Sequence, residues 1–178
     1  IPYLSGTKVE VESIQHTLQN NNAITTIVFK GKDAVENVIR NINPQSVKIV
    51  HVATHGFYDS EDTLLSNPII NVFQSDMEDR MLSRNGLYMA GAQNTLDGDI
   101  IPEGVDDGIL TAQEISTLDL RGLDLVTLSA CETGLGEVSG EGVFGLQRGF
   151  KKAGVQSILM SLWKVDDEAT CKLMTEFY

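Results

Sequence analysis

Short apolar runs recur along the chain at intervals that suit an α/β fold. Runs rich in β-branched and other apolar residues predict four strands, at 24–29, 46–53, 123–131 and 157–163. The run at 46–53 is apolar on both faces over most of its length, which is typical of a buried parallel strand.

Stretches with apolar residues at helical spacing lie before, between and after these runs. They predict helices at 6–19, 32–42, 111–120, 141–154 and 166–178. Two of these begin with a Thr followed three residues later by Glu, the capping-box pattern: Thr7 with Glu10, and Thr111 with Glu114. The alternation predicts an α/β domain with a mostly parallel sheet and helices on both faces.

The region from 57 to 108 does not follow this alternation. It contains short strand candidates at 68–73 and 86–91, separated by polar loops rich in Gly and Asp. Seven acidic and no basic residues lie between Asp97 and Asp119, which we interpret as a solvated loop and helix face.

Length and charge limit the classes of partner. A chain of 178 residues suits one well-buried domain. The formal net charge of −12 argues against nucleic acid and anionic membranes as partners, and favours basic ones. The two cysteines cannot form a disulfide framework, no secretory signal pattern opens the chain, and no apolar run reaches the ~20 residues of a membrane span. We therefore expect a cytoplasmic protein.

A histidine and a cysteine follow the carboxyl ends of two predicted strands, the edge where open α/β sheets bind ligands. His55 follows the strand at 46–53, and Cys131 ends the run at 123–131. A thiol needs a neighbouring base or imidazolium to be a good nucleophile at neutral pH. The placement predicts a His55–Cys131 pair for nucleophilic catalysis.

Gly56 suggests how such a site could stabilise an oxyanion. Its amide can face a substrate without a side chain in the way, and the amide of Cys131 is a natural second donor. The alternative, a glycine that only turns the chain out of the strand, stays open.

Other motifs are weaker. His51 and His55 have H-x-x-x-H spacing, but four residues of strand span about 13 Å, so we expect no zinc site and interpret His51 as a strand histidine with its own partners. Residues 140–145 match G-x-G-x-x-G, yet the first glycine does not follow its strand directly, so a dinucleotide site is a distant alternative.

Cys171 lies in the last predicted helix, and we expect its side chain to have a packing role. No cofactor is expected.

The longer motifs resemble those of the CHAT domain, a branch of the caspase-like cysteine peptidases. The matching stretches are LSGTKVEVESI, IVHVATHGF, LYMAGAQN, DDGILTAQEISTLDL, LVTLSACETGLGEVSGEGVFGLQRGF and SLWKVDDEATCKLM, which together cover nearly the whole chain. The resemblance implies a caspase-like three-layer sandwich, His55 as base, Cys131 as nucleophile, and the amides of Gly56 and Cys131 as oxyanion hole.

The resemblance also bears on specificity and context. SLWKVDD is similar to the segment of separase in which a late aspartate binds a basic P1 side chain, and Asp167 occupies that position, with Asp166 beside it as the helix cap. We expect residues 1–178 to form one domain of a longer bacterial chain with tetratricopeptide repeats upstream. The expected function is a cysteine endopeptidase acting on a protein substrate and activated by the repeats or a partner; the alternative is a catalytically silent interaction module.

Overall fold

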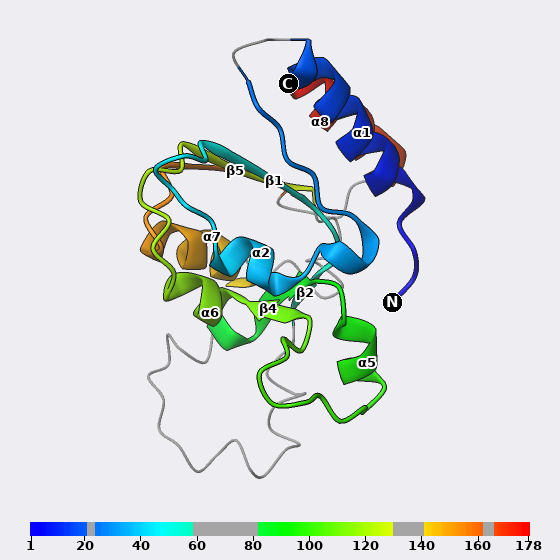
Figure 1. The fold of residues 1–178 in the computed structure, drawn as a ribbon, viewed down its shortest axis with the longest axis vertical. Helices are drawn as coiled ribbons and strands as arrows, with labels where there is room; N and C mark the ends of the chain where they lie inside the picture. Colours follow the sequence, from blue (N-terminus) through cyan, green and yellow to red (C-terminus); the bar gives the residue numbers. More distant parts are fainter. Residues whose placement is uncertain (21–23, 59–81, 130–140, 162–165) are drawn as a thin grey trace.

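A computed structural model describes residues 1–20, 24–58, 82–129, 141–161 and 166–178. Its strands form two sheets (Figure 1). The parallel sheet has the order β1-β5-β6, with β1 at Ile49–Ala53, β5 at Leu125–Ser129 and β6 at Ser157–Met160. The antiparallel sheet has the order β2-β3-β4, with β2 at Gly56–Tyr58, β3 at Asn85–Tyr88 and β4 at Ile109–Thr111.

The helices of the described residues vary widely in length. Their bounds are α1 Ser5–Gln19, the 3₁₀ turn η1 Gly31–Asp33, α2 Glu36–Arg40, α5 Ala92–Leu96, α6 Ala112–Ser116, α7 Glu141–Lys152 and α8 Asp167–Phe177. Gly154, with φ of 98°, follows α7 in the left-handed conformation that favours glycine after a helix. The predicted α/β content, the parallel sheet and the capping box of Thr111 with Glu114 are confirmed.

The central strand β5 separates two environments, because successive side chains of a strand point to opposite faces. Val126 and Leu128 lie in the hydrophobic core together with Phe150 of α7. Thr127 and Ser129 point to the other face, where they contact α8 and α1. Helices therefore cover both faces of the parallel sheet, with α1 and α8 on one side and α7 on the other (Figure 1).

The strand predicted at 24–29 is wrong. Residues 24–30 have no regular secondary structure, and Ile24, Ile27 and Phe29 are exposed. A β-branched run becomes a strand only where a partner ladder and a packing surface are present, and here the segment instead links α1 to η1. The strand candidate at 68–73 lies outside the described residues.

Two helix predictions also change. The predicted helix at 32–42 is divided into η1 and the short α2. The capping box of Thr7 with Glu10 is wrong, because α1 begins earlier, at Ser5, and Leu4 at its N-cap makes no side-chain capping bond. The Glu10 carboxylate is instead buried against the parallel sheet.

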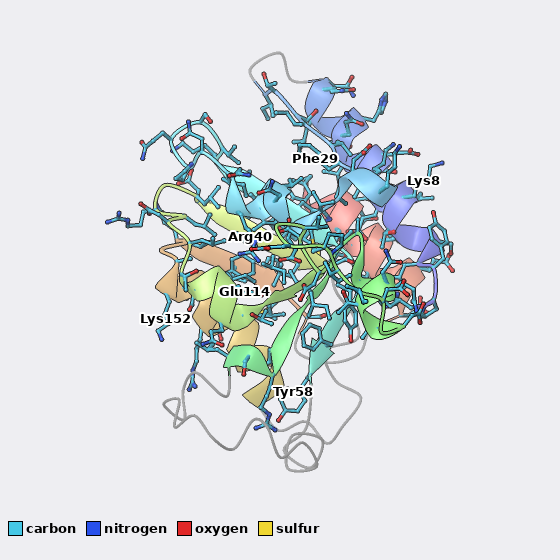
Figure 2. The ribbon with its side chains drawn as sticks, turned by 60° about the horizontal axis from the view of Figure 1, so that its bottom comes forward. Lys8, Phe29, Arg40, Tyr58, Glu114 and Lys152 are labelled. Carbon is cyan, nitrogen blue, oxygen red and sulfur yellow. The ribbon has the colours of Figure 1, made fainter. Side chains whose placement is uncertain are left out.

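An ion-pair cluster joins α2 to α6 on the side of the molecule away from α1. Arg40 lies between two carboxylates, 2.6 Å from Glu36 and 3.0 Å from Glu114 (Figure 2). Burial, the largest influence, raises the pKa of Glu36 in spite of Arg40. At Glu114 burial is again the largest influence, but hydrogen bonds from Thr111 and Arg40 outweigh it and lower the pKa. The cluster fixes α2 against the start of α6.

Candidate active site

The carboxyl ends of β1 and β5 lie side by side. Ala53 pairs with Ser129 in the parallel ladder, and the Thr54 amide donates a 3.3 Å hydrogen bond to the Ser129 carbonyl. His55 follows Ala53 by two residues, and Cys131 follows Ser129 by two residues. Cys131 itself lies outside the described residues. The structure thus places the predicted histidine beside the end of the strand that leads to the predicted cysteine.

His55 is held at both its backbone and its ring. Its carbonyl accepts a 2.9 Å hydrogen bond from the Tyr88 amide of β3, and only 6% of its surface is exposed. Nε2 lies 2.8 Å from the Pro2 carbonyl oxygen. Because a carbonyl can only accept, Nε2 carries the proton, and Nδ1 is the acceptor nitrogen of the neutral ring. The contact with Pro2 therefore selects one tautomer of His55.

Gly56 is buried at the start of β2 and pairs with Leu87 of β3. In an antiparallel ladder, hydrogen-bonded and non-hydrogen-bonded pairs alternate. The bond from Tyr88 to His55 makes those two residues a hydrogen-bonded pair, so Gly56 and Leu87 form the other type. The Gly56 amide therefore points away from β3 and is not used in that ladder. Its role as an oxyanion donor stays a prediction.

A buried carboxylate joins the two strands from the α1 side. Glu10 is 1% exposed; its Oε1 lies 2.7 Å from Nε2 of His51 on β1, and its Oε2 accepts a 2.9 Å hydrogen bond from the Ser129 hydroxyl on β5. The expectation that His51 is a strand histidine with its own partners is confirmed. Sequence analysis missed this role of Glu10, because its spacing from Thr7 suggested a helix cap.

Tyr178 approaches the same strands from the end of α8. Its hydroxyl donates a 2.8 Å hydrogen bond to Thr127 of β5 and lies 3.3 Å from Nδ1 of His51. Burial is the main reason why the pKa of Tyr178 is raised. Because α1 and α8 also pack on each other, these hydrogen bonds join the two helices to the two strands that precede the candidate site residues.

The two aspartates of the predicted substrate pocket, Asp167 as the contact and Asp166 as the helix cap, lie at the start of α8. Asp166 is the N-cap residue, and its Oδ1 accepts a 3.0 Å hydrogen bond from the Ala169 amide. The expected capping role of Asp166 is confirmed. Asp167 is the first residue of α8, and its side chain lies outside the described part of the structure. Cys171 is half-buried on the same helix.

The fold and this sheet edge define an α/β domain that carries a buried, oriented histidine where its parallel strands end. Comparison with known families identifies the family of the chain. The family described as "CHAT domain" matches residues 1–178, and the chain belongs to that family. Neither the curated proteins nor the solved structures gave a match. None of the helices in the described residues is long and apolar enough to cross a membrane.

Proposed function

We propose that this CHAT domain is a cysteine endopeptidase of caspase-like three-layer fold, with His55 as base and Cys131 as nucleophile. The observation that carries the proposal is the pairing of Ala53 with Ser129, since both candidate residues follow this pair by the same two positions. Two parallel chains that continue in register bring such residues to the same edge. The relation of the CHAT family to caspase-like peptidases supports the same chemistry.

The proposed reaction proceeds through a thioester. Nδ1 of His55 takes the thiol proton of Cys131, and the sulfur attacks the carbonyl carbon of the scissile peptide bond. The amides of Gly56 and Cys131 donate hydrogen bonds to the resulting oxyanion. When the C–N bond breaks, the imidazolium of His55 protonates the leaving amine. Nδ1 then takes a proton from water, and the resulting hydroxide adds to the thioester carbonyl. The C–S bond breaks to give a carboxylic acid, and the imidazolium returns its proton to the Cys131 thiolate.

The Pro2 carbonyl serves as a positioning group in this scheme. Since it accepts from Nε2, it keeps Nδ1 as the basic nitrogen and stabilises the imidazolium that forms during the reaction. A carboxylate fulfils this role in serine proteases, and a neutral carbonyl does so without introducing a buried charge.

Specificity is proposed to come from the start of α8. A carboxylate at Asp167 can pair with an Arg or Lys side chain of the substrate at P1, while Asp166 is occupied in capping the helix. The net charge of −12 attracts basic segments to the domain. Tetratricopeptide repeats upstream or a protein partner are proposed to activate the domain in a bacterial cytoplasm.

Peptide cleavage tests the proposal. We expect the full-length protein, supplied with its activating partner, to cleave a peptide library, and Cys131→Ala and His55→Ala each to abolish cleavage. Cys171→Ala is the matched control and retains activity. Folded protein that cleaves nothing, together with slow alkylation of Cys131, would favour the second candidate function, a protein-binding CHAT module without catalysis.

A further inference from the structure

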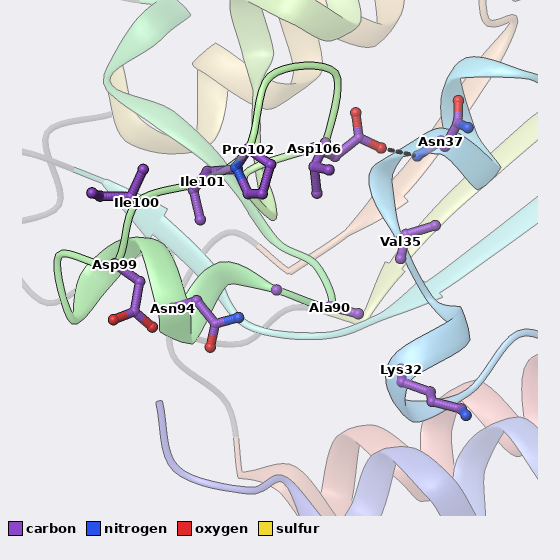
Figure 3. A pocket seen from close by; sticks show the side chains of 12 residues that line it. Lys32, Val35, Asn37, Ala90, Asn94, Asp99, Ile100, Ile101, Pro102 and Asp106 are labelled. Atoms are coloured by element: carbon purple, nitrogen blue, oxygen red, sulfur yellow. Dashed lines mark hydrogen bonds between the residues drawn. The ribbon is translucent and has the colours of Figure 1, made fainter.

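A groove of about 700 Å³ lies between α5 and the segment that contains η1 and α2 (Figure 3). Lys32, Val35 and Asn37 line one side of it. The loop that follows α5, over residues 99–106, lines the other side, and the backbone of Ala90 and Gly91 lies between the two. We call this cavity the α5 groove.

The two sides of the α5 groove are fixed to each other. The Ala90 amide donates a 2.9 Å hydrogen bond to the Ala34 carbonyl, and the Asn37 amide donates a 3.1 Å bond to Asp106. Below them, the buried Glu36 accepts a 2.7 Å bond from the Gly108 amide. These bonds link α2 to the far end of the loop, so the α5 groove is formed before any ligand enters, and ligand binding does not have to order it.

The loop side of the α5 groove combines exposed aliphatic side chains with negative charge. Ile100 is 95% exposed and Val105 is 58% exposed, although each is large and apolar. The same loop is acidic: between Asp97 and Asp107 there are five acidic residues and no basic one, and two of the five, Asp99 and Asp106, line the α5 groove opposite Lys32. A lone exposed isoleucine needs no explanation. Aliphatic side chains beside carboxylates in a preformed groove, however, offer apolar contact area together with negative charge that favours cationic partners.

We propose that the α5 groove binds an extended peptide segment of a partner protein in which an aliphatic side chain is flanked by Lys or Arg. Ile100, Ile101 and Val105 supply the surface for the aliphatic side chain, and the exposed Asp99 pairs with a cation of the peptide. The Asp106 carboxylate is already engaged by the Asn37 amide and lies 3.8 Å from Arg40. This inference goes beyond the proposed function, because the α5 groove can hold a partner whether or not the domain cleaves it.

The position of the α5 groove suits a substrate as well as a regulator. Ala90 lies two residues beyond Tyr88, whose amide is bonded to the His55 carbonyl. Two extended residues span about 7 Å. The α5 groove thus lies a short distance along the chain from the residue bonded to His55, and a substrate bound both there and at His55 would gain affinity without a new catalytic contact.

The test measures binding apart from cleavage, in the Cys131→Ala protein. The probe is a fluorescein-labelled peptide, Gly-Ser-Arg-Ile-Lys-Ser-Gly, followed by fluorescence anisotropy. Ile100→Ser and Asp99→Lys should each weaken binding about tenfold or more, and both residues are exposed, so neither change disturbs the core. Raising the salt from about 50 mM to about 500 mM should also weaken binding.

One variant should act in the opposite direction. Lys32→Glu removes the positive charge from the other side of the α5 groove and should strengthen binding of the basic peptide, a result that damage to the fold cannot produce. Asp124→Lys is the control, since it makes the same charge change as Asp99→Lys at an exposed position just before β5, where the Asp124 backbone amide donates a 2.8 Å hydrogen bond to the Lys48 carbonyl.

Three results would overturn the proposal. One is no anisotropy change with the basic peptide. Another is equal binding of a peptide in which Glu replaces Arg and Lys, or Ser replaces Ile. The third is an affinity that Ile100→Ser and Asp99→Lys leave unchanged. Because cleavage plays no part in the measurement, loss of the proposed peptidase activity would leave this result intact.

Discussion

The carboxylate of Glu10 on α1 accepts a 2.9 Å hydrogen bond from Ser129, the last residue of the strand that leads to Cys131. Its other oxygen lies 2.7 Å from His51, on the strand that leads to His55. One buried side chain therefore connects a helix to both strands of the candidate active site. A change in the position of α1 would therefore alter the contacts of both strands.

Glu10→Ala should destabilise the domain by about 3 kcal/mol, because it leaves the polar groups of His51 and Ser129 buried without their acceptor. Urea unfolding followed by circular dichroism measures the change. Glu10→Gln keeps one acceptor oxygen and should cost less. Glu12→Ala on the same helix removes an exposed ion pair with Lys30, which solvent screens, and should leave stability nearly unchanged. Equal effects at positions 10 and 12 would contradict the buried role.

The reactivity of the two cysteines tests the dyad directly. At neutral pH, Cys131 should react with iodoacetamide faster than Cys171, because only Cys131 is expected to have thiolate character. His55→Ala should slow the labelling of Cys131 and leave that of Cys171 unchanged. Mass spectrometry of the labelled peptides gives both rates. If the two cysteines label equally fast, with or without His55, the dyad does not exist.

The Pro2 carbonyl can be removed only by removing the residue. Deletion of Ile1–Tyr3 should lower kcat about tenfold with little change in KM, because the imidazole loses its oriented tautomer while substrate binding is untouched. Pro2→Ala and Tyr3→Ala keep the carbonyl and should retain activity. An unchanged kcat after the deletion, or an increase, would show that the contact does not support catalysis.

Local patterns in the sequence predicted most of the framework. The strands β1, β5 and β6 lie within the runs predicted at 46–53, 123–131 and 157–163, and the helices α6, α7 and α8 lie within the ranges 111–120, 141–154 and 166–178, because periodicity and capping residues act over a few positions. The helix predicted at 111–120 is shorter than expected, since α6 ends at Ser116. The strand predicted at 24–29 is wrong, since its β-branched run pairs with no strand in the described part of the chain. The order of the parallel strands, β1-β5-β6, could not be predicted from local patterns and is known only from the structure.

The polar contacts of the candidate site could not be predicted from spacing. Glu10 lies 41 residues from His51 and 119 from Ser129 in the sequence, and Pro2 lies 53 residues from His55. The position of Glu10 three residues after Thr7 matched a capping box, and only tertiary packing of α1 on the sheet gave that carboxylate its partners. The position of His55 just after a strand could be predicted, because the end of a strand is marked by local sequence.

The exposed pair of Asp119 and Arg121 allows a prediction on pH. Two hydrogen bonds of 2.7 Å from the Arg121 guanidinium hold the pKa of Asp119 at about 2, below its ordinary 3.8. A carboxyl whose pKa is lowered by folding stabilises the fold above its unfolded pKa, and loses that effect as the pH falls through the folded value. NMR titration should give a midpoint near 2, and Arg121→Ala should return it toward 3.8. An unchanged midpoint in that variant would contradict the assignment.

The two aspartates at the start of α8 should separate stability from specificity. Asp166 caps the helix through its 3.0 Å bond to Ala169, so Asp166→Ala should cost about 1 kcal/mol in urea unfolding and leave the P1 profile unchanged. Asp167→Ala should lower kcat/KM for peptides with Arg or Lys at P1 at least tenfold, which is about 1.4 kcal/mol of transition-state binding, and leave Cys131 labelling intact. Asp167→Asn controls for size, because it keeps the shape but loses the charge, and it should lose the basic preference as well. A cleavage profile led by Asp or by apolar residues at P1 would refute the role of Asp167 while leaving the His55–Cys131 chemistry standing.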